Sequence, residues 1–240
     1  LRGVLSPLSL GEVEATLDGL FANVDRLASG RRRDLAMRDH AAVEPGSKIL
    51  EISRPLLLRP DLRRSAVFRE CRRMARALDS RLSAYAFDHA IYKLPNSEAP
   101  TEWHQDEAFA ESQRARSTLH FWIPLQEVGV EHGCMHYVPG SHRWGLLQHE
   151  RCETVDGDST LRVRLPDAAR AVAVPVAAGD VVVHLPRTLH CASGNSVPRT
   201  RKAWVLHFGA FGVLSKLHPA ELSARAVKWL TRGSPRRRGK

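Results

Sequence analysis

Beyond residue 80 the apolar residues of this 240-residue chain recur with a period of two, which limits the fold more than any other feature. Such alternation is typical of strands with one buried face. Turn signals such as Pro95-Asn96, Pro139-Gly140 and Gly179-Asp180 divide the region into short pieces, and no helical segments alternate with them. Seven strands are predicted, at residues 82–93, 117–127, 134–138, 160–164, 170–176, 179–184 and 201–211.

The first 80 residues show helical spacing instead. Ser9-Leu10-Gly11-Glu12 has the pattern of a capping box and precedes apolar residues at three- and four-residue intervals. This pattern predicts a helix over about 10–28. A second amphipathic pattern predicts a helix over 61–79, and a short strand is expected at 48–52.

Together these patterns indicate one domain, residues 1–230, in which the strands form a β-sandwich or jelly-roll barrel. Its expected parts are a helical buttress at 1–80, a jelly-roll core at 81–212 and a C-terminal helix at 219–231. Residues 232–240 are expected to form a flexible basic tail. The apolar share of 43% is large enough to bury a core, which excludes a wholly disordered chain.

The net charge of +10 is concentrated in two segments. Residues 54–76 contain eight arginines against Asp61 and Glu70, a net charge of +6, and the tail carries +5. The other 208 residues therefore carry a net charge of −1. Nucleic-acid-binding surfaces usually interleave basic and aromatic residues, whereas Phe68 is the one aromatic residue in these two segments. A solvated helix face is favoured, and no specific nucleic acid is expected as a partner.

Two features bear on the compartment. No run approaches the roughly 18–20 apolar residues of a membrane-spanning helix, so no membrane span is expected. Cys71, Cys134, Cys152 and Cys191 show no paired spacing, which favours reduced thiols in a cytoplasmic protein over disulfides or a cysteine-rich zinc site. Because the chain opens with Leu1 rather than Met, missing residues before it, including a removed signal, are an alternative that stays open.

The chemically most informative segment is Glu102-Trp103-His104-Gln105-Asp106-Glu107. In an extended backbone His104 and Asp106 point to the same face, so one imidazole and one carboxylate can reach a single ion. The His-x-Asp pattern is common in loops, and on its own it favours an ordinary surface segment. A metal site therefore needs a third ligand from elsewhere in the chain.

His190 is distinguished among the twelve histidines by its position. It follows the turn and apolar strand of residues 178–184 and precedes Arg201 by eleven residues. Two histidines and a carboxylate on a β-barrel match the facial triad of non-haem Fe(II) oxygenases. A nearby arginine suits 2-oxoglutarate, because a guanidinium binds a carboxylate through two parallel hydrogen bonds.

Four segments resemble the phytanoyl-CoA dioxygenase family of Fe(II)/2-oxoglutarate-dependent oxygenases. They are Trp103–Asp106, Gly133–His142, Gly179–Val183 and the stretch from His190 through Asn195 to Ala203. They occur in the family's order, with family-like spacing, and span about residues 82–212. The resemblance implies a double-stranded β-helix (a jelly-roll, cupin-like core) that uses Fe(II), 2-oxoglutarate and O₂.

The resemblance also implies roles for individual residues. His104, Asp106 and His190 are expected to ligate iron, and Arg201 to bind the far carboxylate of 2-oxoglutarate. Ser193 stands where the family often has glycine, so the backbone there is expected to differ. Three further matches are expected to contact 2-oxoglutarate. They are Trp122, the looser match Lys93, and Asn195 in the loop after His190, the histidine ligand distant in sequence from the other two ligands.

Strand parity adds candidates for the pocket wall. His120 shares a strand face with Trp122, and His207 shares one with Arg201, so both histidines point inward if their partners do. A core histidine hydrogen-bonded to the sheet is the alternative for each. His184 also lies near the distal ligand, but it would stand seventeen residues from Arg201 instead of eleven and is not preferred.

The resemblance implies an enzyme that hydroxylates, or otherwise oxidises a C–H bond of, a small-molecule metabolite with release of succinate and CO₂. Secondary metabolism is the expected setting. Halogenating relatives lack the carboxylate that Asp106 supplies, so hydroxylation is favoured over halogenation. The alternatives are a non-catalytic binding protein on the same barrel and a nucleic-acid demethylase of the superfamily. The sequence selects neither the substrate nor the oligomeric state.

Overall fold

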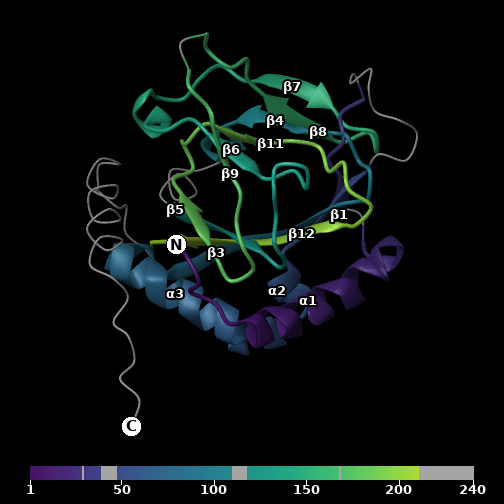
Figure 1. Cartoon of the computed structure of the whole chain (residues 1–240), viewed down its shortest axis with the longest axis vertical. Coiled ribbons are helices and arrows are strands. Elements are labelled where there is room, and N and C mark those ends of the chain that lie inside the picture. Colours follow the sequence, from purple (N-terminus) through teal and green to yellow (C-terminus); the bar gives the residue numbers. More distant parts are fainter. Residues whose placement is uncertain (29, 39–47, 110–117, 168, 211–240) are drawn as a thin grey trace.

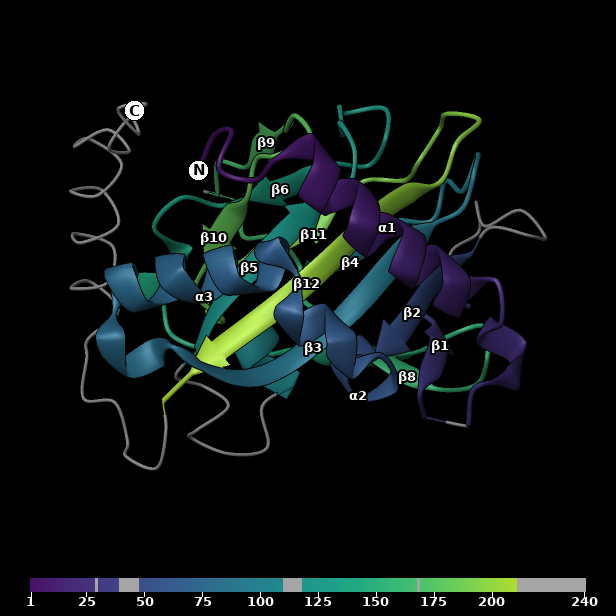
Figure 2. The ribbon, with the colours of Figure 1, turned by 90° about the horizontal axis from the view of Figure 1, so that it is seen from below.

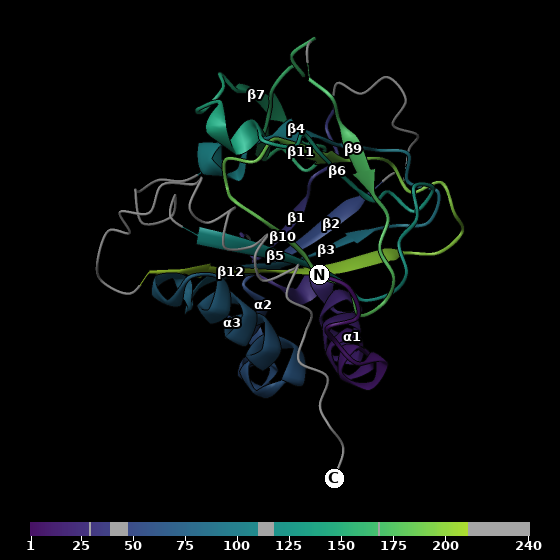
Figure 3. The ribbon, with the colours of Figure 1, turned by 60° about the vertical axis from the view of Figure 1, so that its left-hand side comes forward.

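In a computed structural model the chain forms two antiparallel sheets that face each other, with helices outside the larger one (Figure 1, Figure 3). This arrangement confirms the expected mainly-β jelly-roll fold with flanking helices. The structure describes residues 1–28, 30–38, 48–109, 118–167 and 169–210. The helix expected at 219–231 and the basic tail lie outside the described residues.

The larger sheet has six strands, and its centre brings together residues that are far apart in sequence. Arg201 lies opposite Lys93, and His207 lies opposite His120. In spatial order the strands are β1 (Arg32–Asp34), β2 (Ile49–Ser53), β3 (Ala84–Lys93), β12 (Arg201–Gly209), β5 (Thr118–Pro124) and β10 (Val182–His184).

The smaller sheet has four short strands, and two of them place His190 directly opposite His104. A separate hairpin, formed by the strands β7 and β8, lies next to this sheet at the top of Figure 1. In spatial order the sheet consists of β4 (Thr101–His104), β11 (His190–Ala192), β6 (Met135–Tyr137) and β9 (Val172–Val174), and the hairpin of β7 (Glu150–Glu153) and β8 (Ser159–Arg162).

The helices α1 (Pro7–Phe21), α2 (Pro55–Leu58) and α3 (Ala66–Leu78) cover the outer face of the larger sheet (Figure 2). Short 3₁₀ turns connect or flank the elements, namely η1 (Val24–Arg26), η2 (Pro60–Arg64), η3 (Ser80–Leu82), η4 (Asp106–Phe109) and η5 (Ser141–Arg143).

Strand β5 is buried on both faces because it separates two apolar cores. Its residues Phe121 and Ile123 pack in the cluster that includes the helices, whereas Trp122 packs with residues of the smaller sheet. Alternation with a period of two therefore sends one set of side chains to the helices and the other set into the space between the sheets. The polar residue His120 belongs to the second set.

The helix boundaries differ from those predicted. Helix α1 begins at Pro7 rather than near residue 10, because the Ser6 side chain accepts a hydrogen bond from Ser9 N and proline suits the first helical position. It ends at Phe21 instead of residue 28. Residues 60–64 form a 3₁₀ turn, so α3 begins later than predicted, after its N-cap Ser65.

The predicted strands are present, most of them with shorter bounds and β2 and β8 shifted by one residue at their start, but β1, β4, β7 and β11 and the helix α2 were not predicted. These elements have only three or four residues, too few to show a period. Within the described residues no helix is both long and apolar enough to span a bilayer. The four cysteines are free thiols, and Cys191 is the one that is partly exposed.

Candidate active site

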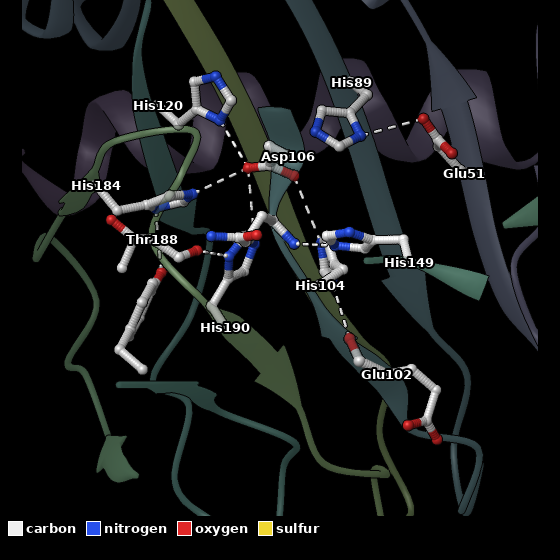
Figure 4. Close-up of polar contacts among 12 residues, drawn as sticks. Glu51, His89, Glu102, His104, Asp106, His120, His149, His184, Thr188 and His190 are labelled. Atoms are coloured by element: carbon white, nitrogen blue, oxygen red, sulfur yellow. Dashed lines mark hydrogen bonds and ion pairs between the residues drawn. The ribbon is translucent and has the colours of Figure 1, made fainter. Parts of the chain in front are cut away.

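Two histidines and an aspartate converge between the sheets, where β4 and β11 pair (Figure 4). Strand β4 ends at His104, and Asp106 opens the turn η4, so the extended backbone expected through this segment is wrong at Asp106. The side chains still converge. His104 Nε2 lies 3.4 Å from Asp106 Oδ1, and His190 Nε2 lies 3.6 Å from Asp106 Oδ2.

Backbone carbonyls fix the orientation of both imidazoles. His104 Nδ1 donates to the carbonyl oxygen of Glu102 at 2.7 Å, and His190 Nδ1 donates to that of Thr188 at 2.8 Å. Each ring therefore directs Nε2 toward Asp106. In metal-ligating histidines one ring nitrogen usually binds the metal while the other donates to a carbonyl, a carboxylate or water, as Nδ1 does here. Burial and the neighbouring His104 hold the pKa of His190 well below its ordinary value, which leaves its Nε2 lone pair free to bind a metal.

Asp106 is an anion in this setting. Burial by itself raises the pKa of this carboxyl, but the imidazoles of His190, His120 and His104 outweigh it and hold the pKa well below its ordinary value. One ligand atom from each of His104, Asp106 and His190 can be chosen so that all three lie within 4.8 Å of one another. Two imidazole nitrogens and one carboxylate fit a first-row divalent ion.

Gln105, between the two ligand residues, points the opposite way and anchors the segment. It is completely buried, and its amide nitrogen donates to the carbonyls of Gly145 and Arg187 at 2.9 and 2.8 Å. Its amide oxygen accepts from Leu147 N at 2.8 Å. Gln105 thereby ties the His-x-Asp segment to the loop that leads into β11 and His190.

Arg201 is a buried cation with unused hydrogen-bonding capacity. It is 2% exposed, and its Nε and Nη1 have no hydrogen-bond partner among the described residues. The guanidinium carbon lies 5.6 Å from the centre of the Trp122 ring. Burial lowers the pKa of Arg201 to about 10. An unpaired buried charge is unfavourable, so this site fits an anion whose two oxygens pair with the guanidinium.

Lys93 and Asn195 lie next to Arg201 and bind backbone oxygens. Lys93 Nζ donates to three carbonyls, the nearest being that of Ser193 at 2.6 Å. The Asn195 amide nitrogen donates to the carbonyls of Lys93, Leu94 and Arg199. Both side chains therefore fasten β3 to the loop after β11, and a direct contact of either with 2-oxoglutarate stays a prediction.

Two further histidines reach the same carboxylate. His120 Nδ1 lies 2.7 Å from Asp106 Oδ2, and His184 Nε2 lies 3.2 Å from the same oxygen. The inward orientation of His120 and His207 is confirmed, because their rings stack at 3.6 Å. The sequence predicts the inward orientation of His120, because it shares a strand face with Trp122. Nothing in the sequence predicts the contact of His184 with Asp106. Asp106, His120 and His184 form a second set of three donors within 4.8 Å.

A cavity of about 210 Å³ opens beside His104 and Asp106. Its wall contains a polar pair, the buried Glu51 and the partly exposed His89, with Glu51 Oε1 3.1 Å from His89 Nδ1 (Figure 4). Burial raises the pKa of Glu51 and lowers that of His89, but their mutual attraction outweighs burial in both and makes them an ion pair. The rest of the wall is mixed, with Arg33, Leu35, Met37, Phe87, Ile91, Pro100, Thr101, Glu102, Phe109, Thr160 and Leu161.

Part of this wall comes from two segments that the sequence predicts at the rim of the pocket, 143–166 and 107–116, which follow the motif segments. The cavity includes Thr160, Leu161 and Phe109 from them, whereas 110–117 lies outside the described residues. Its polar residues Glu51 and His89 were missed, because they come from strands that only the folded sheet brings beside the His-x-Asp segment.

Comparison with known proteins identifies relatives for most of the chain. The sequence profile of the phytanoyl-CoA dioxygenase (PhyH) family matches residues 1–203. Phytanoyl-CoA dioxygenase domain-containing protein 1 of Bos taurus is 28% identical over 138 residues, which cover 56% of this chain and 47% of the bovine protein. A probable alpha-ketoglutarate-dependent hypophosphite dioxygenase of Stutzerimonas stutzeri is 30% identical over 122 residues, 48% of this chain and 42% of that protein. The chain thus spans about half the length of these curated relatives.

Solved structures match over nearly the whole chain. EvdO2 from Micromonospora carbonacea var. aurantiaca, crystallised with 2-oxoglutarate, is 30% identical with a TM-score of 0.69, covering 92% of this chain and 89% of EvdO2. SnoK, a non-heme alpha ketoglutarate dependent carbocyclase from nogalamycin biosynthesis, is 27% identical with a TM-score of 0.64, covering 91% of this chain and 85% of SnoK.

Proposed function

This chain belongs to the phytanoyl-CoA dioxygenase family, and from that premise we propose that it is an Fe(II)- and 2-oxoglutarate-dependent oxygenase of a small-molecule metabolite. Hydroxylation of a C–H bond is the expected outcome. The observation that carries the proposal is the convergence of His104, Asp106 and His190 beside a cavity, with the unpaired Arg201 cation in the same barrel. The likeness to SnoK, from an antibiotic pathway, supports a role in secondary metabolism.

The donor set fits Fe(II), which His104, Asp106 and His190 would hold. Three protein ligands leave coordination positions for the co-substrates. When bound, the iron couples the decarboxylation of 2-oxoglutarate to succinate and CO₂ with the activation of O₂ for oxidation of the substrate. The protein contributes fixed geometry, because carbonyl oxygens hold both imidazoles and Gln105 holds the segment between the ligands.

Arg201 would bind the carboxylate of 2-oxoglutarate that lies farther from the metal. Two of its nitrogens have no partner among the described residues, and a carboxylate supplies two oxygens in matching geometry. The Trp122 ring lies beside the guanidinium and restricts its orientation. Because this site is buried, water screens the charge pair little, and the pair selects a co-substrate with a second carboxylate.

The cavity beside His104 and Asp106 would hold the substrate. The apolar residues of its mixed wall favour a partly apolar molecule, and the Glu51–His89 pair offers a hydrogen-bonding contact. The arginine-rich helix α3 lies on the outer side of the larger sheet, away from this cavity (Figure 3). This position gives no support to a nucleic acid as substrate.

The experiment is anaerobic loading with Fe(II) and 2-oxoglutarate, followed by exposure to O₂ and measurement of succinate, alone and with candidate metabolites. We expect metal-dependent succinate in the unmodified protein and its loss in Asp106→Ala and in His190→Ala. Binding of metal and 2-oxoglutarate without any succinate would favour the non-catalytic alternative. Retained turnover and metal occupancy in His190→Ala would assign the distal ligand to His184.

A further inference from the structure

The carboxylate of Asp106 is held from two sides by imidazoles outside the proposed iron ligands. His120 Nδ1 and His184 Nε2 both contact Oδ2, at 2.7 and 3.2 Å, within hydrogen-bonding distance. Of the proposed ligands, His190 Nε2 lies farther from Oδ2, at 3.6 Å, and His104 Nε2 faces Oδ1 (Figure 4). An ionised carboxylate can only accept hydrogen bonds, so both ring nitrogens donate. Two donors occupy the acceptor capacity of one oxygen and leave the other oxygen available.

A hydroxyl group fixes each of these imidazoles on its far side. His120 Nε2 lies 2.8 Å from Thr118 Oγ1, and His184 Nδ1 lies 3.3 Å from Tyr137 Oη. In the tautomer whose other ring nitrogen donates to Asp106, each of these nitrogens accepts a hydrogen bond from the hydroxyl group. The result is one chain of hydrogen bonds, Thr118–His120–Asp106–His184–Tyr137, in which each imidazole has a set tautomer.

Packing holds the two rings in place. His120 stacks on His207 with 3.6 Å between ring centres and meets the His184 ring at 5.3 Å and 72°. Both residues are at least nine-tenths buried. Neither ring can turn toward solvent without breaking a buried hydrogen bond, so their donors are preorganised toward Oδ2.

We propose that His120 and His184 are positioning residues that hold Oδ2 of Asp106 and so present Oδ1 alone to the metal. This inference rests on the ligand set of the proposed function. A carboxylate bound through one oxygen takes one coordination position, whereas a carboxylate bound through both takes two. The pair thereby keeps open a position that the co-substrates need.

The test is the dissociation constant of Co²⁺, titrated into metal-free protein and followed by its visible absorption, with no turnover involved. We expect His120→Leu and His184→Leu to weaken Co²⁺ binding by about 10–100-fold, the usual effect of removing a group that orients a metal ligand. The far-UV circular dichroism and melting temperature of each variant report its folding.

Amide substitutions provide matched controls, because the amide nitrogen of asparagine coincides with imidazole Nδ1 and that of glutamine with Nε2. His120→Asn and His184→Gln keep the donor to Asp106 and are expected to bind Co²⁺ within about threefold of the unmodified protein. His120→Gln and His184→Asn place the same amide toward Thr118 and Tyr137 instead and are expected to bind as weakly as the leucine variants.

Equal Co²⁺ affinity within each Asn/Gln pair would overturn the proposal, even if the leucine variants fail to fold. Complete loss of Co²⁺ in His120→Leu and His184→Leu, with binding kept in His190→Ala, would also overturn it and assign the metal to the second donor set. The proposed function fails separately, if Asp106→Ala and His104→Ala bind Co²⁺ as tightly as the unmodified protein.

Discussion

Arg201, the proposed binding residue for the far carboxylate of 2-oxoglutarate, is a buried cation with two nitrogens unpaired among the described residues. We expect Arg201→Ala to lose about 2–5 kcal/mol of 2-oxoglutarate binding, as when one partner of a desolvated charge pair is removed. The KM for 2-oxoglutarate in the succinate assay, which rises at least 30-fold on this estimate, measures the effect.

Arg199→Ala is the control for this prediction. Arg199 is exposed, and its Nε donates to His132 at 2.7 Å, so its loss is expected to leave the KM within about twofold. A large KM effect in Arg199→Ala and none in Arg201→Ala would transfer the carboxylate site to Arg199 and refute the spacing argument from His190.

The Glu51–His89 pair predicts a pH-dependent contribution to stability. His89 has a pKa raised above 6.5 by Glu51 despite burial, so its contribution is full below pH 6.5 and is lost as pH rises through the raised value. His89 lowers the pKa of Glu51 below 4.5, so the stabilisation from Glu51 is full above pH 4.5 and is lost as the pH falls through the lowered pKa. Arg33, 4.0 Å from Glu51, adds to the lowering.

Urea unfolding of the unmodified protein and of Glu51→Gln, at pH 5.5 and pH 8.5, measures this contribution. We expect the difference in unfolding free energy between the two proteins to be larger at pH 5.5, where His89 is charged and Glu51 is ionised. When the two proteins are compared at the same pH, the contributions of groups that titrate alike in both cancel from the difference in unfolding free energy. An equal difference at both pH values would show that the pair is not ionic in the folded protein.

The same two residues mark the limit of sequence analysis at this scale. The proposed iron ligands were identified because two of the four matching segments carry them in family order. Glu51 and His89 lie on β2 and β3, away from any motif, and they line the cavity only because these strands pair. His184 was recognised as a neighbour of the distal histidine, but its contact with Asp106 depends on how β10 packs, which no spacing reveals.

At the scale of elements, the proposed ligands depend on strands too short to be stable alone. Strands β4 and β11 have four and three residues, and the buried Gln105 supplies three hydrogen bonds to partly buried backbone groups that hold their connections. We expect Gln105→Leu to remove these three hydrogen bonds, at a cost of about 0.5–1.5 kcal/mol in unfolding free energy for each. Urea unfolding measures this loss, and Co²⁺ affinity is expected to weaken with it.

Gln126→Leu is the matched control. Its side chain also bonds the backbone, at Thr200 O and Lys202 N, but on the larger sheet away from the metal ligands. We expect it to lose stability without loss of Co²⁺ affinity. If both glutamine variants weaken Co²⁺ equally, general destabilisation explains the effect and Gln105 has no special part in holding the ligands.

Helices and strands were predicted correctly where the residues repeat a pattern. They were missed where hydrogen bonds to neighbouring strands determine the conformation. The long strand β3 alternates between more and less buried residues along most of its length, and the nine-residue strand β12 was predicted although most of its residues are buried. The three-residue strand β11 has no period, and its conformation follows from the hydrogen bonds that β4 and β6 offer on either side. The start of α1 was misplaced because two serines stand three residues apart, and Pro7 favours the earlier one as N-cap.

At the scale of the whole molecule, the site joins the two sheets. The proposed histidine ligands belong to the smaller sheet, whereas Arg201, Trp122 and His120 belong to the larger one. A metal with 2-oxoglutarate would therefore link residues of both sheets. Any ligand that binds only the folded state raises its stability in proportion to the logarithm of ligand concentration over Kd.

This linkage makes a prediction for thermal unfolding with Mn²⁺ and 2-oxoglutarate, each at about 100 times its Kd. Each ligand adds about 2.7 kcal/mol, and for a chain of this size each such increment raises Tm by about 5–10 °C. Asp106→Ala is expected to lose both increments, because 2-oxoglutarate binds largely through the metal. Arg201→Ala is expected to keep the Mn²⁺ increment and lose that of 2-oxoglutarate. A 2-oxoglutarate increment retained in Arg201→Ala, or a Mn²⁺ increment retained in Asp106→Ala, would place that ligand elsewhere in the molecule.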